Sequence, residues 1–213
     1  MMAGLSEMRH MQGTMPKSQI PPSVSVALRA PSSRSSYPTH VLAIATAGTS
    51  SSDPKHTLIP VHAVTLAAHC AKLPALPPSN ARVSGNNMQL PVLPLSLPSP
   101  AAFSILHTFM YTHRLDGVLK ALLPLPTQFL EGLSHHGVRQ ALASSTTLHQ
   151  LSSFVCASSN GNLQTITGHT AHVKEIWQDM VSLGLYDPEL WDAIDLTWEI
   201  VLGALNLGAA ASK

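Results

Sequence analysis

The sequence predicts a mixed α/β (α+β) fold, with a small sheet of about three strands and with helices dominating. Two β-prone runs flank a turn near residue 50, and apolar residues after residue 127 recur at helical spacing. Sixteen of the 17 prolines lie before residue 127, so the residues that break helices are concentrated in the front of the chain.

We expect the chain to divide into three parts. Residues 1–36 combine Pro, Ser, Met and Gln without apolar periodicity, which predicts a disordered N-terminal arm. Residues 37–125 should form an α/β domain, and residues 126–207 a helical C-terminal extension packed on it. A chain of 213 residues is long enough for one such domain and a tail.

Within the α/β domain, extended runs and one helix follow in order. His40–Thr46 and His56–Val61 are β-prone, and a segment dense in Gly, Ser, Asp and Pro separates them, which predicts a hairpin. His62–Ala71 has helical spacing. Met88–Leu97 is a third extended run. Because two prolines within it cannot donate to a ladder, we expect an edge strand or a partly polyproline-like segment.

Capping signals place the helices that follow. Ser99-Pro100 is a start signal for a helix over 101–112, with Ser as the N-cap and Pro as the first helical residue. Further helices are predicted from Thr127, over Leu148–Ala157, from Thr170 to a C-cap at Gly184, and from Asp187-Pro188-Glu189 onward.

Charge is scarce and unevenly distributed. Charged residues make up 11% of the chain, against about 25% in typical domains. The net charge is +1, but residues 1–139 carry ten Lys/Arg and four acids, whereas residues 140–213 carry two Lys and seven acids. A basic front and an acidic back allow weak steering of partners. The whole chain has no nucleic-acid signature, so we expect no direct contact with nucleic acid.

The cysteines and the apolar runs favour an intracellular protein. Cys70 and Cys156 lie far apart and form no CxxC, which argues against a secreted disulfide scaffold. The first residues contain no apolar h-region, so no signal peptide is expected. The longest apolar runs, such as Val41–Ala45, are far shorter than the ~20 residues of a membrane helix, so no membrane contact is expected.

Two segments resemble the BTB/POZ domain. Residues 57–70, TLIPVHAVTLAAHC, are similar to a strand that leads into a His and a helix with a buried Leu. Residues 95–112, LSLPSPAAFSILHTFMYT, are similar to a capped helix with a Phe, an aliphatic pair and an F-x-Y-T ending. The resemblance implies a BTB/POZ-like domain over 37–125. Its core positions are His62, which should cap a helix or bond backbone, and Leu66, Phe103, Leu106, Phe109 and Tyr111.

A larger part of the chain resembles the clampless proteins of basidiomycetes. The Ser/Pro-rich front, HTLIPVHAVTLAAHC, LPVLPLSLPSPAAFSILHTFMYTHRLD and an acidic helical tail with Trp are similar to that family over most of residues 37–205. The resemblance implies a fungal regulator of sexual development, needed for clamp cells and for proliferation of the dikaryon. It also implies a nuclear and cytoplasmic protein that binds transcription factors without catalysis. The alternative is a BTB-type homodimerising protein or ubiquitin-ligase adaptor.

Motifs of enzymes and metal sites are missing from the sequence. His169, His172 and Glu175 are spaced three apart, but there is no HExxH and no Cys pair, so a metal site is not predicted. His135-His136 is more often a solvated pair than a ligand set. There is no GxSxG or P-loop. We therefore predict no enzyme, no cofactor and no catalytic residue, and an uncharacterised hydrolase or a direct DNA-binding protein is less favoured.

The last helix is the candidate interaction surface. Asp192, Asp195 and Glu199 share its polar side, opposite a stripe formed by Leu190, Ile194, Trp198, Val201, Leu202 and Leu205. Trp191 lies beside that stripe and is predicted to be a partly exposed anchor for a protein partner. Trp177 and Trp198 are expected to pack inside. The ordinary alternative is that all three Trp are buried, and homodimerisation is a rival use of the surface.

Overall fold

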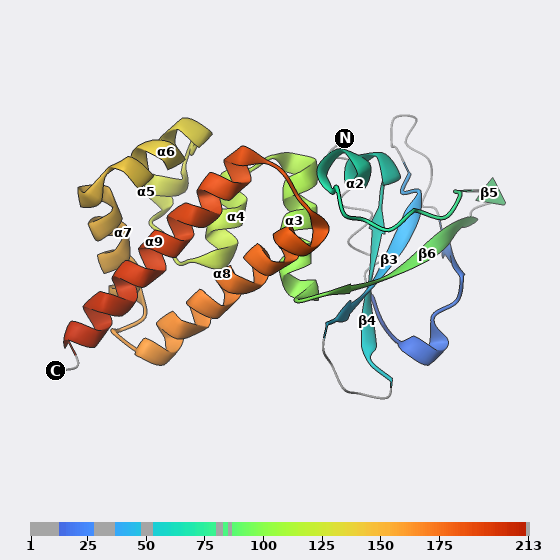
Figure 1. The fold of residues 1–213 in the computed structure, drawn as a ribbon, viewed down its shortest axis with the longest axis horizontal. Helices are drawn as coiled ribbons and strands as arrows, with labels where there is room; N and C mark the ends of the chain where they lie inside the picture. The colour runs from blue at the N-terminus through green and yellow to red at the C-terminus, as the bar shows by residue number, and fades with distance from the viewer. Residues whose placement is uncertain (1–12, 28–36, 48–52, 80–82, 85–86, 212–213) are drawn as a thin grey trace. The chain divides into compact units, whose positions relative to one another are not determined.

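The computed structural model describes residues 13–27, 37–47, 53–79, 83–84 and 87–211 (Figure 1). Contacts divide the chain into two compact units. The sheet unit comprises residues up to Ser104 together with Met110–Thr112 and Val181–Leu185. The helical unit comprises Ile105–Phe109, His113–Met180 and the chain from Tyr186 onward. The predicted α/β class and helical second half are confirmed.

The described residues contain six strands and eight α-helices. The strands are β1 (Gly13–Pro16), β2 (Ser23–Ala27), β3 (His40–Thr46), β4 (Lys55–Val61), β5 (Val83–Ser84) and β6 (Asn87–Leu97). The helices are α2 (Ala63–His69), α3 (Pro100–Thr112), α4 (Leu115–Leu122), α5 (Thr127–Leu130), α6 (His135–Ala143), α7 (Ser145–Ser158), α8 (Leu163–Leu183) and α9 (Pro188–Ala211), with a short 3₁₀ helix over Lys17–Gln19.

The strand order of the sheet is β1-β4-β3-β6-β2, with β5 paired to β6. β3 and β4 form the predicted antiparallel hairpin, and β3 and β6 run parallel. The prediction of about three strands was wrong, because the described part of the sheet extends beyond the hairpin and β6. The two outermost strands of the main path, β1 and β2, come from the N-terminal arm. The BTB/POZ-like assignment is not confirmed.

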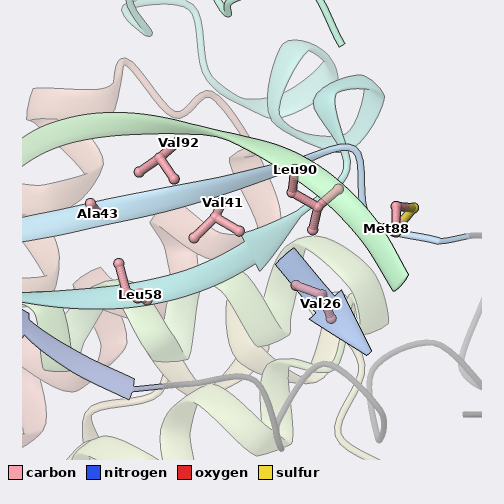
Figure 2. Packing of buried hydrophobic residues seen from close by; sticks show 7 residues of the cluster. All are labelled: Val26, Val41, Ala43, Leu58, Met88, Leu90 and Val92. Atoms are coloured by element: carbon pink, nitrogen blue, oxygen red, sulfur yellow. The ribbon is translucent and has the colours of Figure 1, made fainter. Parts of the chain in front are cut away.

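Residues 13–27 are ordered, contrary to the expectation of a disordered arm. Figure 2 shows Val26 of β2 together with Val41 of β3 and Leu90 of β6 in one apolar cluster. The backbone N–H of Ser18 donates to Asp53 Oδ1 at 2.9 Å. The expectation missed a short strand pattern, because Ser23–Ala27 (SVSVA) alternates polar and apolar residues. Such short strands need few apolar side chains when a sheet edge supplies the partner groups. The rest of residues 1–36 lies outside the described residues.

β6 is an inner strand and not the predicted edge strand or polyproline segment. The Val92 N–H donates to the Pro22 carbonyl on the β2 side at 3.0 Å. Backbone nitrogens two residues apart in a strand face the same edge of that strand. The nitrogen of Pro94, two residues after Val92, therefore faces the β2 side of β6, at a point beyond the last residue that pairs with β2. The nitrogen of Pro91 faces the β3 side, before the β3–β6 ladder begins. Each proline therefore removes an N–H that neither ladder requires.

The residues expected in the core are buried. His62, Leu66, Phe103, Leu106, Phe109 and Tyr111 all have side chains at most 8% exposed. The backbone N–H of His62 donates to the Tyr111 hydroxyl at 2.9 Å, and His62 Nδ1 lies 2.8 Å from the same oxygen. The His62 side chain does not cap α2. Burial raises the pKa of Tyr111, so its hydroxyl stays neutral and able to donate.

Most predicted helix ends agree with the structure. Ser99 Oγ accepts the Ala102 N–H at 3.3 Å at the start of α3, and Gly184 follows α8 with a φ of 62°. The segment from Thr127 is two helices, α5 and α6, because Gly132 between them has a φ of 69°. α8 begins at Leu163 and not at Thr170, because Asn162 Oδ1 accepts two N–H groups of its first turn.

Candidate interaction surface

The first turn of α9 is fixed by a side-chain cap. Asp187 Oδ1 accepts the N–H of Glu189 at 3.1 Å and of Leu190 at 3.2 Å. Pro188 is the first residue of the helix, where its missing N–H costs no hydrogen bond. Asp187 also lies 3.8 Å from His113 Nδ1. The start that the sequence predicted for this helix is therefore correct to the residue.

One face of α9 is buried and the other carries the acids. Asp195 and Glu199 are exposed, one turn apart along the helix, whereas Trp191 and Asp192 are half-buried. Leu202 is 47% exposed beyond them. The buried residues of the helix are Leu190, Ala193, Ile194, Leu196, Thr197, Ile200, Val201, Ala204 and Gly208.

Asp192 is engaged by a histidine that sequence reasoning assigned to solvent. His135 Nε2 lies 2.7 Å from Asp192 Oδ2, and His135 Nδ1 lies 3.9 Å from Glu189 Oε1. His135 is the first residue of α6, 57 positions from Asp192. A contact across that separation leaves no local pattern in the sequence. The freely accessible carboxylates of the candidate surface are therefore Asp195 and Glu199.

The carboxylates on the exposed side of α9 repel one another. Partial burial, together with the negative charges of Asp192 and Glu199, raises the pKa of Asp195. The like charges lie at helical neighbour spacing, which opposes ionisation of Asp195. A positively charged group placed beside Asp195 would relieve this repulsion.

Two of the three Trp side chains differ from the expectation. Trp191 is half-buried, in line with a partly exposed anchor, but Trp198 is also half-buried. Trp177 is 41% exposed, so the prediction that it packs inside was wrong. The buried stripe of α8 runs through Val173, Ile176 and Met180, which leaves Trp177 one position outside it. Sequence periodicity alone cannot decide whether Trp177 is buried or exposed, because Trp177 lies at the border of the apolar stripe.

Cys70 is a candidate nucleophile by residue type, and His169 and His172 are candidate metal ligands, but the surroundings of these residues are those of structural side chains. Cys70 Sγ lies 3.9 Å from Met110 Sδ, and burial raises the pKa of its thiol to about 11, which keeps it protonated and poorly nucleophilic. His169, His172 and Glu175 are half-buried along α8. Across the part of the chain that the structure describes, no group of three or more His, Cys, Asp or Glu is placed to hold a metal ion.

Within the described residues, α9 is the one helix that is long and apolar enough to cross a membrane, judged by length and composition alone. A helix that belongs to a protein core passes the same test, and one face of α9 is buried in the helical unit. The sequence interpretation missed this property because it considered uninterrupted apolar runs, whereas α9 carries isolated acids between apolar residues.

Comparison with known families identifies the chain. Residues 1–98 match the Clampless protein 1 N-terminal domain, and residues 116–213 match the Clampless protein 1 C-terminal domain. The chain belongs to the clampless family. The resemblance to clampless proteins is thus confirmed, and family membership indicates a role in clamp formation during fungal sexual development. No curated protein and no solved structure matches the chain.

Proposed function

We propose that this clampless-family protein regulates fungal sexual development without catalysis, by binding transcription factors in the nucleus and cytoplasm. The observation that carries the proposal is the solvent face of α9, where two exposed carboxylates adjoin half-buried Trp side chains. Trp is favoured at binding hot spots because it combines a large apolar area with a polar N–H.

The chemistry of the face favours a basic, partly apolar partner surface. Asp195 and Glu199 supply acceptors whose mutual repulsion a cation relieves. Leu202 and Trp191 supply apolar area on the same helix. DNA-binding regions of transcription factors are rich in Lys and Arg, so such a region is complementary to this face. The scarcity of charge elsewhere on the chain makes the acidic face distinctive.

The test is affinity purification of the full chain from mating cells. The wild type is compared with Trp191→Ala and with the double variant Asp195→Asn, Glu199→Gln, which removes two negative charges without changing side-chain size. A double variant on α7, Gln150→Lys with Ala157→Lys, changes the net charge equally at exposed positions and is the matched control. We expect the α9 variants to lose nuclear partners that the control retains.

Two results would contradict the proposal. Recovery of the same transcription factors by folded versions of every variant would exclude the α9 face. Recovery of no transcription factor by the wild type would exclude recruitment itself. Circular dichroism of each variant separates lost binding from lost folding. Light scattering of the purified wild type tests homodimerisation, the rival use of this face.

A further inference from the structure

Two hollows flank the short helix α5 and the turn that follows it. The first has a volume of about 560 Å³ and the second about 540 Å³. Glu131 and Gly132 line both, so the hollows adjoin at that turn. All their lining residues belong to the helical unit. Volumes in this range are typical of binding sites. We call this pair the α5 hollows.

The α5 hollows expose apolar side chains that their own helix leaves uncovered. None of the four residues of α5 is buried. Leu130 lines the first hollow and Phe129 the second, and both are half-buried. Leu123 and Leu125 are buried side chains that also line the first hollow. A partner segment that crosses α5 would therefore find apolar side chains in the hollow on each side of the helix.

Four charged side chains line the α5 hollows, and two of them pair with each other, which leaves one cation and one anion without a charged partner among the described residues. The Arg114 guanidinium is held by Asp116 through two hydrogen bonds, one of them from Nε at 3.1 Å. Lys120 and Glu131 are exposed, and the described part of the chain contains no ion pair or side-chain hydrogen bond to either. Lys120 lines the first hollow alone, whereas Glu131 lies at the shared turn.

This pattern selects one class of ligand. An acidic lipid headgroup or a nucleic acid is anionic and would meet Glu131 as a like charge. A polypeptide can place an acidic residue at Lys120, an apolar residue against α5 and a basic residue at Glu131. In the second hollow, Gln128 and Gln140 offer donors and acceptors that suit a peptide backbone.

We propose that the α5 hollows bind a short extended segment of a partner protein in which an acidic and a basic residue flank apolar ones. The proposal shares with the proposed function the idea that the protein acts by binding proteins, but it uses a surface other than α9. Gly132 is the point where the two hollows meet, and a Cβ there would project into open space.

The test uses the full chain, ¹⁵N-labelled, titrated with blocked synthetic peptides that carry one aspartate and one lysine around leucine and serine, in a short series of spacings. We expect amide shifts concentrated over residues 114–147, which include the lining of both hollows. Lys120→Glu should weaken binding about fivefold, and Glu131→Lys by a similar factor, while exchanging the peptide's two charges should weaken the wild type. Lys174→Glu, at an exposed position of α8, should change nothing.

A further variant keeps the test independent of charge. Gly132→Asn suits the left-handed backbone, because Asn tolerates positive φ, and it fills the shared part of the hollows. We expect it to fold normally and to lose peptide binding. Equal binding by all variants, shifts confined to another surface, or concentration-dependent self-association that Gly132→Asn abolishes would each overturn the proposal. These outcomes are independent of partner recovery by the α9 variants, so failure of one proposal is distinguishable from failure of the other.

Discussion

The sheet unit and the helical unit both bury polar side chains, but they differ in charge, because Asp53 is the one acid among the described residues of the sheet unit and the other described acids lie in the helical unit. In the sheet unit, polar groups bond inside the fold: Thr39 Oγ1 accepts the Ala63 N–H at 2.7 Å, and His40 Nε2 lies 2.8 Å from the Pro77 carbonyl oxygen. In the helical unit, charges such as Lys120 and Asp195 lie on the surface. Substitutions of polar residues in the sheet unit should therefore change stability, and substitutions on the helical surface should change binding.

The largest effect should follow from opening a cavity in the buried end of α3. Phe103 is fully buried, so Phe103→Ala loses both transfer free energy and packing and should lower the free energy of unfolding by about 3–5 kcal/mol. Val64→Ala on α2, where the side chain is 69% exposed, should change it by less than about 0.5 kcal/mol. Denaturant unfolding measures both. An equally stable Phe103→Ala variant would remove α3 from the core.

A smaller loss should follow from removing one oxygen atom. Tyr111→Phe keeps the ring but leaves the buried His62 N–H without its acceptor, so the free energy of unfolding should fall by about 1–3 kcal/mol. Tyr186 is 82% exposed, and Tyr186→Phe is the matched control with no expected change beyond about 0.5 kcal/mol. If both variants unfold alike, the hydroxyl of Tyr111 does not support the sheet unit.

Two helical glycines should respond oppositely to the same substitution. A Cβ at Gly203 of α9 would lie 2.9 Å from Ser152 Cβ, so Gly203→Ala should destabilise the helical unit by about 1–3 kcal/mol. A Cβ at Gly168 of α8 meets nothing within 4 Å, so Gly168→Ala should stabilise by up to about 1 kcal/mol through helix propensity. Thermal unfolding of the pair tests this, and a shared sign would mean that α7 and α9 do not approach closely at Ser152.

Local patterns predicted most elements, and long-range pairing explains what they missed. Caps at Ser99 and Asp187 are decided by neighbours within one turn, so the sequence was sufficient to place α3 and α9. β1 and β2 depend on edges supplied by β4 and β6, tens of residues away. The contact of His135 with Asp192 and the α5 hollows likewise arise from packing between helices, for which the sequence carries no local signal.

The smallest predicted effect tests whether the acids of α9 are kept at a cost to stability. Asp195 has a raised pKa in the folded state, so the folded state binds the proton more tightly than the unfolded chain does. Stability from this group is therefore complete below its unfolded pKa and is lost as pH rises through the folded pKa. Asp195→Asn abolishes that loss.

Because the group is exposed and screened by solvent, the variant should be more stable by no more than about 0.5 kcal/mol near about pH 7, with the gain vanishing near about pH 3. Added salt should remove part of the difference, because screening weakens the repulsion from Asp192 and Glu199 but not the effect of partial burial, which is the largest cause of the raised pKa. Glu131→Gln is the control, because Glu131 is the C-cap residue of α5, a helix that contains no acid. A variant less stable than the wild type at neutral pH would mean that Asp195 stabilises the helix, and the acidic face of α9 would then need no functional explanation.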